Sequence, residues 1–182
     1  GFDTHPHRDM EIVTYVIDGA LTHGDSMQNV STLKRGEIQY MSAGTGVFHS
    51  EKNNGDEILR LLQIWILPDC SGYAPQYGEV RIPWEARENM LLHIISGQKE
   101  AAYVQIHQDM DIYVSALSSG KELDIPVEPS RQVYLIVMEG EAECNGICLQ
   151  QRDAAKIDES FCIKTSKGAH IMLFDMAKED FL

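Results

Sequence analysis

Short apolar runs separated by turn residues dominate the chain, and helical periodicity is nearly absent. Most runs are rich in β-branched or aromatic residues and end near Gly, Asn, Asp or Ser, a pattern typical of antiparallel strands and their turns. About a dozen such runs predict an all-β protein of the sandwich or barrel type. The predicted strands are Ile12–Ile17, Val30–Leu33, Ile38–Met41, Leu59–Leu67, Leu91–Ile95, Tyr103–Ile106, Ile112–Leu117, Gln132–Met138, Ala142–Cys144, Ile147–Leu149, Ala154–Ile157, Phe161–Ile163 and Ile171–Phe174.

Residues 68–90 form the clearest break in this pattern. Three of the six prolines fall here, together with two glycines. This composition predicts an ordered linker, which also contains the best candidate for a short helical turn, at residues 83–88. The sequence therefore predicts a first β-domain at 1–67, the linker at 68–90 and a second β-domain at 91–182.

Two stretches of the second half resemble two stretches of the first. Tyr15–Ala20 and Leu135–Glu141 both consist of an apolar strand, an acidic residue and a glycine. Leu33–Ile38 and Leu149–Ala155 both consist of a strand end, a turn and a new strand start. The pattern predicts two related halves built on one scaffold. The second half has Glu128–Gln132 before its strand, without a histidine pair, so a single site is expected.

Two pairs of potential metal ligands share the same spacing. His5 and His7 precede the strand Ile12–Ile17, and His49 and Glu51 lie in a second extended stretch. In an extended chain, residues i and i+2 point to the same side, so each pair presents its side chains together. Two such strands side by side would bring three imidazoles and one carboxylate together. These donors suit Fe(II), Mn(II), Ni(II), Cu(II) or Zn(II), and a six-coordinate ion would keep two positions open.

Other interpretations of these residues stay open at this stage. His5 and His7 can also be surface residues of a frayed chain end, and His49 a hydrogen-bonded core histidine. Glu11 has the same strand parity as His7 and is an alternative ligand. A tetrahedral zinc bound by all four residues would have no open position and would be structural.

The remaining histidines are expected to have lesser roles. His23 and Asp25 are expected to be polar residues of a turn, with a role at the site mouth as the alternative. His93, His107 and His170 are assigned to the second half and expected to be structural.

Charge and composition exclude some classes of function. The 182 residues are 43% hydrophobic and 24% charged, which is ordinary for a globular protein. The net charge is −13 and the 15 basic residues are scattered, whereas nucleic-acid surfaces need clustered Lys and Arg. No segment reaches the ~20 apolar residues of a membrane helix. We therefore expect a cytoplasmic protein without a direct nucleic-acid or membrane partner.

The cysteine spacing does not resemble a disulfide framework. Cys144 and Cys148 flank Asn145–Gly146, a strong signal for a type I′ hairpin. Cys144 would then face Ile147, which leaves Cys148 on the opposite face of the sheet, and a disulfide between the two would be strained. All four cysteines are predicted to be reduced.

These motifs together resemble the pirin family. The stretches that carry the resemblance are His5–Val16, His23–Ser26, Met41–Glu51, Gln63–Ile66 and Val104–Tyr113. The resemblance spans most of the chain and implies a bicupin: two antiparallel, jelly-roll-like β-barrels, of which the first holds one metal, usually iron. Family members normally carry further strands before the His-x-His pair, so the first barrel is expected to lack its N-terminal strands in this chain.

The resemblance also implies a ligand set and a function. The family's ligands fall on His5, His7, His49 and Glu51, and Glu11 is not among them. Some pirins resemble flavonol dioxygenases, so we expect a quercetin 2,3-dioxygenase-type oxidoreductase that uses O₂ and Fe(II), with Zn, Mn, Ni or Cu as alternatives. Glu51 would be ligand and catalytic base, which requires its carboxylate to loosen from the metal.

Two further expectations complete this interpretation. Met41, Phe48 and Trp65 are expected as apolar pocket walls, or as plain core residues. The alternative function is a non-enzymatic, iron-dependent regulator that binds a protein partner, such as a transcription co-regulator.

Overall fold

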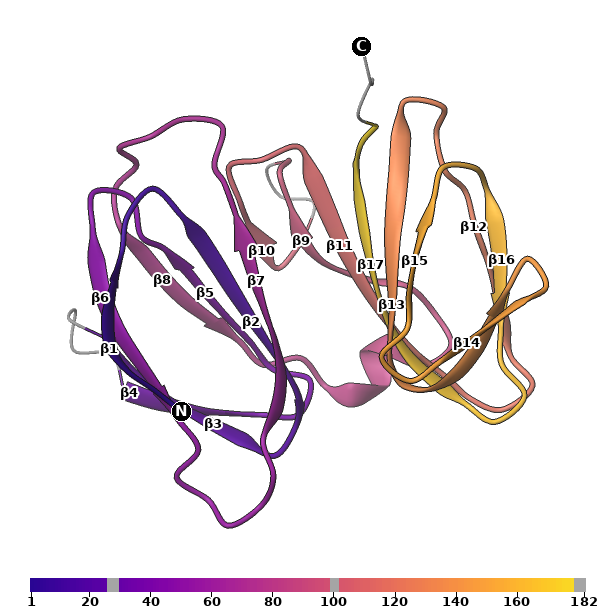
Figure 1. Ribbon diagram of the computed structural model, residues 1–182, viewed down its shortest axis with the longest axis horizontal. Helices are drawn as coiled ribbons and strands as arrows, with labels where there is room; N and C mark the ends of the chain where they lie inside the picture. Colours follow the sequence, from indigo (N-terminus) through magenta and orange to yellow (C-terminus); the bar gives the residue numbers. More distant parts are fainter. Residues whose placement is uncertain (26–29, 99–101, 179–182) are drawn as a thin grey trace. The chain divides into compact units, whose positions relative to one another are not determined.

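The computed structural model describes residues 1–25, 30–98 and 102–178 (Figure 1). Nearly all regular structure in these residues is β-strand, as predicted. A short 3-10 helix, η1 (Trp84–Arg87), lies where a helical turn was expected. The chain divides into two compact units, Gly1–Pro83 with Ile106–Gln108, and Trp84–Gln105 with Asp109–Leu182. No helix in the described residues is both long and apolar enough to span a membrane.

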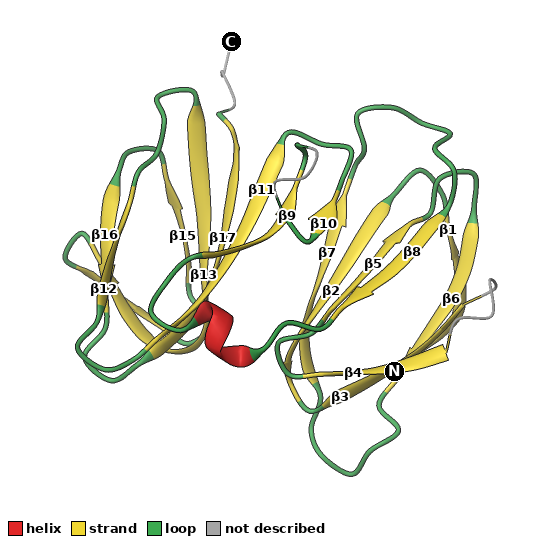
Figure 2. Ribbon diagram, turned by 180° about the vertical axis from the view of Figure 1, so that it is seen from behind, coloured by secondary structure: helices red, strands yellow, loops and turns green. Residues whose placement is uncertain are grey.

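The first unit consists, in its described residues, of two antiparallel four-stranded sheets (Figure 2). In sheet order, one contains β1 (Phe2–His7), β6 (Val47–Lys52), β3 (Ala20–Asp25) and β4 (Val30–Lys34). The other contains β7 (Arg60–Ile66), β2 (Glu11–Asp18), β5 (Ile38–Ser42) and β8 (Gln76–Val80). Side chains of both sheets meet in the interior, where Ile12 and Met41 pack against Val47.

The second unit is built around one long strand. β13 (Arg131–Cys144) pairs with β14 (Ile147–Gln150), β15 (Ala154–Ile157), β16 (Phe161–Lys164) and β17 (Ala169–Ala177). β12 (Glu122–Ile125) pairs with β16, and β11 (Met110–Leu117), β9 (Leu92–Ser96) and β10 (Val104–Gln105) follow β17. A continuous apolar cluster fills the interior, including Leu135, Phe161, Ile163 and Leu173.

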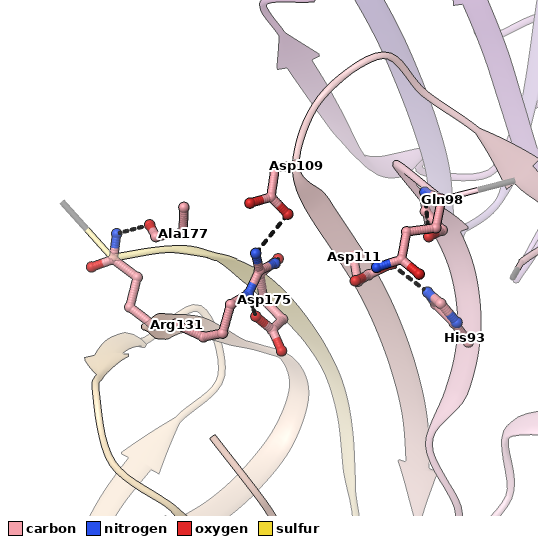
Figure 3. A network of polar contacts seen from close by, with 9 residues as sticks. His93, Gln98, Asp109, Asp111, Arg131, Asp175 and Ala177 are labelled. Carbon is pink, nitrogen blue, oxygen red and sulfur yellow. Dashed lines mark hydrogen bonds and ion pairs between the residues drawn. The ribbon is translucent and has the colours of Figure 1, made fainter. Parts of the chain in front are cut away.

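Ion pairs tie the strands of the second unit together at one end (Figure 3). Nε of Arg131 donates to Oδ1 of Asp175 at 2.7 Å, and its Nη1 donates to Oδ1 of Asp109 at 2.6 Å. On the next strands, Nε2 of His93 lies 2.9 Å from Oδ1 of Asp111. The contacts link β9, β11, β13 and β17 and give His93 the structural role expected of it.

The two units repeat the same turn, which confirms the related halves predicted from the sequence. The N–H of Gly36 donates to the Val16 carbonyl at 2.8 Å, and the N–H of Arg152 donates to the Val137 carbonyl at 2.7 Å. Gly36 and Arg152 have positive φ angles of 79° and 77°. Val16 therefore corresponds to Val137.

A bulge and a close approach of two strands are repeated as well. The pairing register shifts just after Val16 on β2 and just after Val137 on β13. Gly19 and Gly140 then follow, each with φ of 76°. A Cβ at Gly19 would lie 2.6 Å from the Ile58 carbonyl oxygen. A Cβ at Gly140 would clash in the same way, so glycine is required at both positions.

The structure corrects three expectations. His23 and Asp25 lie on strand β3, whereas a turn was predicted; its polar composition hid its alternation. β8 lies inside the expected linker, and its strand pattern was missed for the same reason. His107 belongs to the first unit because Ile106–Gln108 packs there. The predicted cysteine hairpin is confirmed: Cys144 pairs with Ile147, and the described cysteines are free thiols.

Candidate metal centre

The candidate centre lies where β1 pairs with β6. His5 is directly opposite His49 in this antiparallel pair, and His7 is opposite Val47. The i, i+2 spacing therefore places His5 and His7 on one face of β1, beside His49 on β6. Pro6, between the two histidines, lies on β1, which is an edge strand among the described residues, and proline within sheets occurs mainly on edge strands.

The three imidazoles converge. Each of His5, His7 and His49 offers one ligand nitrogen, and these atoms lie within 4.8 Å of one another. Nε2 of His5 and Nε2 of His49 are 3.0 Å apart. The Nδ1–H of His5 donates to the Asp3 carbonyl at 2.8 Å, which fixes the ring and turns Nε2 toward the centre.

This arrangement fits a divalent transition metal. Two nitrogens bound at about 2.1 Å to one ion, at a right angle, lie about 3 Å apart, close to the spacing of His5 and His49. Nε2 of His7 is buried and has no hydrogen-bond partner among the described residues, so a bound ion would satisfy it. Burial lowers the pKa of His7, and the charge of His5 lowers it further. A neutral imidazole is the form that binds metal.

Glu51 lies beside the three histidines but outside their group. Its side chain is buried on the same face of β6 as His49. Nε2 of Gln63 donates to its Oε2 at 2.7 Å, and Oγ1 of Thr14 donates to its Oε1 at 3.2 Å. Burial raises the pKa of Glu51, and the bonds from Thr14 and Gln63 and the charge of His5 oppose that rise. The carboxylate is therefore directed toward the facing sheet.

A continuous row of polar side chains crosses this facing sheet. Cross-strand pairing joins Gln63 to Thr14, Thr14 to Gln39 and Gln39 to Glu79. We call these four residues the polar row. The amide of Gln39 is buried, and neither its nitrogen nor its oxygen has a hydrogen-bond partner among the described residues. Because such groups usually have a partner, the interior is suited to ordered water or a polar ligand.

His23 extends the polar interior. It is fully buried on β3, directly opposite Glu51, and its ring centroid lies 5.6 Å from that of His49. Its ring stacks on that of Tyr77 at 5.0 Å between centroids, and the Tyr77 hydroxyl donates to Glu79. The side chain of Asp25 lies outside the described part of the structure.

The three expected wall residues differ in position. Met41 is buried in the interior with Ile12. Phe48 is 53% exposed on the other face of β6 and does not line the interior. Trp65 is 57% exposed, and its ring meets His7 edge-on at 5.1 Å between centroids. Trp65 therefore lies at the margin of the histidine group.

A cavity of about 430 Å³ has Glu51 among its lining residues. This volume falls in the range of small-molecule sites. The residues that line it are Gly1, Phe2, Leu21, Glu51, Lys52, Asn53, Ile58, Leu59 and Leu61. Its apolar residues beside the Glu51 carboxylate suit a flat, largely apolar ligand that carries an acidic hydroxyl.

Glu11, weighed above as an alternative ligand, faces away from the histidines. The Tyr40 hydroxyl donates to its Oε1 at 2.7 Å. Nδ1 of His107 donates to the same oxygen, and the His107 backbone N–H donates to Oε2, each at 2.8 Å. The ring of His107 stacks on Tyr73. Glu11 therefore anchors residues 106–108 in the first unit.

Sequence reasoning missed the residues that surround Glu51. A signal was present in two of them, because Thr14 and Gln63 interrupt apolar runs at interior positions. Glu79 and Tyr77 lay in the expected linker and carried no such signal.

Comparison with known proteins identifies both halves of the chain. The Pirin family profile matches residues 1–66, and the profile of the quercetinase C-terminal cupin domain matches residues 93–176. A quercetin 2,3-dioxygenase of Escherichia coli K12 is 37% identical over 179 residues, which cover 97% of this chain and 76% of that protein. A pirin-like protein of Caulobacter vibrioides is 38% identical over 180 residues, with coverage of 97% and 78%.

Solved structures agree with these relatives. The bacterial pirin YhhW from Escherichia coli, in complex with nickel(II), is similar with a TM-score of 0.88 at 34% sequence identity. The similarity covers 98% of this chain and 77% of that protein. The fold is therefore the bicupin that the sequence motifs implied.

Proposed function

The chain belongs to the pirin family, and on this basis we propose that it is a quercetin 2,3-dioxygenase-type oxidoreductase with one mononuclear metal. His5, His7, His49 and Glu51 would hold the ion, Fe(II) in the first place. The proposal is supported mainly by the convergence of three histidine nitrogens within 4.8 Å. A relative named quercetin 2,3-dioxygenase and one crystallised with nickel(II) add to this support.

The residues of the chain divide the chemistry between them. When bound, the ion supplies a Lewis acid for the enolic oxygen of a flavonol and redox chemistry with O₂. Glu51 accepts the proton of the enolic hydroxyl; its buried environment raises its pKa and so favours proton uptake. The apolar walls of the adjacent cavity, such as Leu21 and Leu61, pack against the aromatic rings of the substrate.

The decisive experiment measures metal content and quercetin turnover on the same preparation. The protein is reconstituted with Fe(II) without oxygen, and aerobic ring opening of quercetin is then followed by absorbance. We expect one metal per chain and turnover that depends on it. Stoichiometric metal without turnover would contradict the dioxygenase and favour the iron-dependent regulator.

Three variants test the ligand set. His5→Ala and Glu51→Ala are expected to lose metal retention. Glu11→Gln is the matched control, because it keeps a buried side chain of the same shape beside Tyr40 and His107 while removing the charge. It should retain most of the metal. Full retention in Glu51→Ala would remove Glu51 from the ligand set.

A further inference from the structure

The Glu51 carboxylate is held on both oxygens by donors of the polar row. Gln63 donates to Oε2 at 2.7 Å and Thr14 to Oε1 at 3.2 Å. Hydrogen bonds to an ionised carboxylate are about twice as strong as neutral ones. The group of three histidine nitrogens does not include the Glu51 carboxylate, which these two bonds direct toward the facing sheet.

Gln63 is itself held by an exposed residue. Nε1 of Trp65 donates to Oε1 of Gln63 at 3.0 Å, which fixes the amide with its NH₂ group toward Glu51. The ring of the same Trp65 meets the His7 ring edge-on. Trp65 thus contacts a candidate ligand directly and a second one through Gln63.

The second barrel shows that the scaffold does not require these polar side chains. Thr14 pairs with Gln63 two residues before the bulge of β2, and Leu135 pairs with Leu173 two residues before the matching bulge of β13. Leu135 and Leu173 are buried in a continuous apolar core. Leucine is therefore compatible with both positions of this fold, and the glutamine needs another explanation.

We propose that Gln63 is a positioning residue that holds Glu51 off the metal, and that Trp65 sets the orientation of its amide. This inference rests on the proposed function and concerns the position of the Glu51 side chain. With Gln63 bonded, the Glu51 carboxylate stays directed toward the facing sheet. Release of the Gln63 bond allows Glu51 to complete the metal site.

The test is a Ni(II) titration of the metal-free full chain by calorimetry. Gln63→Leu, the residue of the second barrel, removes the holding bond and should tighten Ni(II) binding about tenfold. Trp65→Phe, a change at an exposed side chain, should tighten it by a smaller factor. A residue that orients a bound ligand would give the opposite sign, a loss of about 10–100-fold.

Trp84→Phe is the matched control. Trp84 meets His170 edge-on at 5.0 Å in the second unit, as Trp65 meets His7 in the first, and the change should leave Ni(II) affinity unaltered. Unchanged or weaker binding in Gln63→Leu, with normal binding by the parent chain, would overturn this inference alone. A parent chain that binds no Ni(II) would overturn the proposed function as well.

Discussion

The two barrels of this protein share a backbone pattern and differ in what fills them. Their common turn and bulge give a residue-by-residue correspondence. At five matched interior positions, the first barrel carries a polar residue and the second an apolar one. The corresponding pairs are His5 and Ile125, His49 and Phe161, Glu51 and Ile163, Thr14 and Leu135, and Gln63 and Leu173.

The difference separates stability from function on one scaffold. In the second barrel these positions belong to a single apolar cluster, which favours folding through burial. In the described residues of the first barrel, one small apolar cluster around Ile12 and another around Val16 lie on either side of the polar row. The first barrel therefore holds polar and ionisable groups at positions where the second has apolar core residues.

The largest expected effect is on metal retention, when one buried histidine in each barrel is replaced by alanine. His49→Ala should abolish metal retention, because it removes a nitrogen from the centre. His170→Ala should leave one metal per chain, because His170 bonds to Glu139 in the second barrel. Metal analysis after gel filtration measures both. Equal retention in the two variants would remove the functional distinction between the barrels.

Much of the fold was predictable from the sequence, because strands rich in apolar residues have a clear hydrophobic pattern. The run Ile12–Ile17 and the Cys144–Cys148 hairpin both appear where the pattern placed them. Strand β3 was missed because only one of its inward-facing residues, Leu21, is apolar, and the next one, His23, is polar. A strand that lines a polar interior cannot be recognised from hydrophobicity alone.

The candidate site was predictable in its histidines and not in the position of its carboxylate. Spacing of i, i+2 is a local property, and it brought His5 and His7 to one face. The orientation of the Glu51 side chain depends on donors far away in sequence, Gln63 and Thr14. No local pattern encodes such contacts.

A large effect on stability is expected from the core of the second barrel. Leu135→Ala should destabilise it by about 2–5 kcal/mol, since it leaves a cavity in a fully buried cluster. Urea unfolding followed by the fluorescence of Trp84, which lies in the second unit, measures this. Metal retention by the folded fraction should not change. A loss below about 1 kcal/mol would contradict the role of this cluster.

A smaller effect of opposite sign is expected when the first barrel is made more like the second. Gln39→Leu replaces a buried amide that has no hydrogen-bond partner among the described residues. The change should stabilise the protein by about 1 kcal/mol, because it removes an unsatisfied polar group. Chemical denaturation of the metal-free protein measures the change. Destabilisation instead would contradict the expectation that removing this amide is favourable.

The smallest effect on stability is expected from a surface ion pair of the second barrel. The matching position in the first barrel carries a residue that cannot ionise. Glu141 pairs with Lys167 at 3.0 Å, and Ala20 occupies the matching position in the first barrel. The bond from Lys167 lowers the pKa of Glu141 below its usual value of 4.5. A lowered pKa stabilises the folded state above the unfolded pKa, and this contribution is lost as pH falls. Lys167→Met should therefore weaken the decline in unfolding free energy between about pH 5 and pH 3, measured by urea unfolding. An unchanged slope would show that screening by solvent cancels the pair.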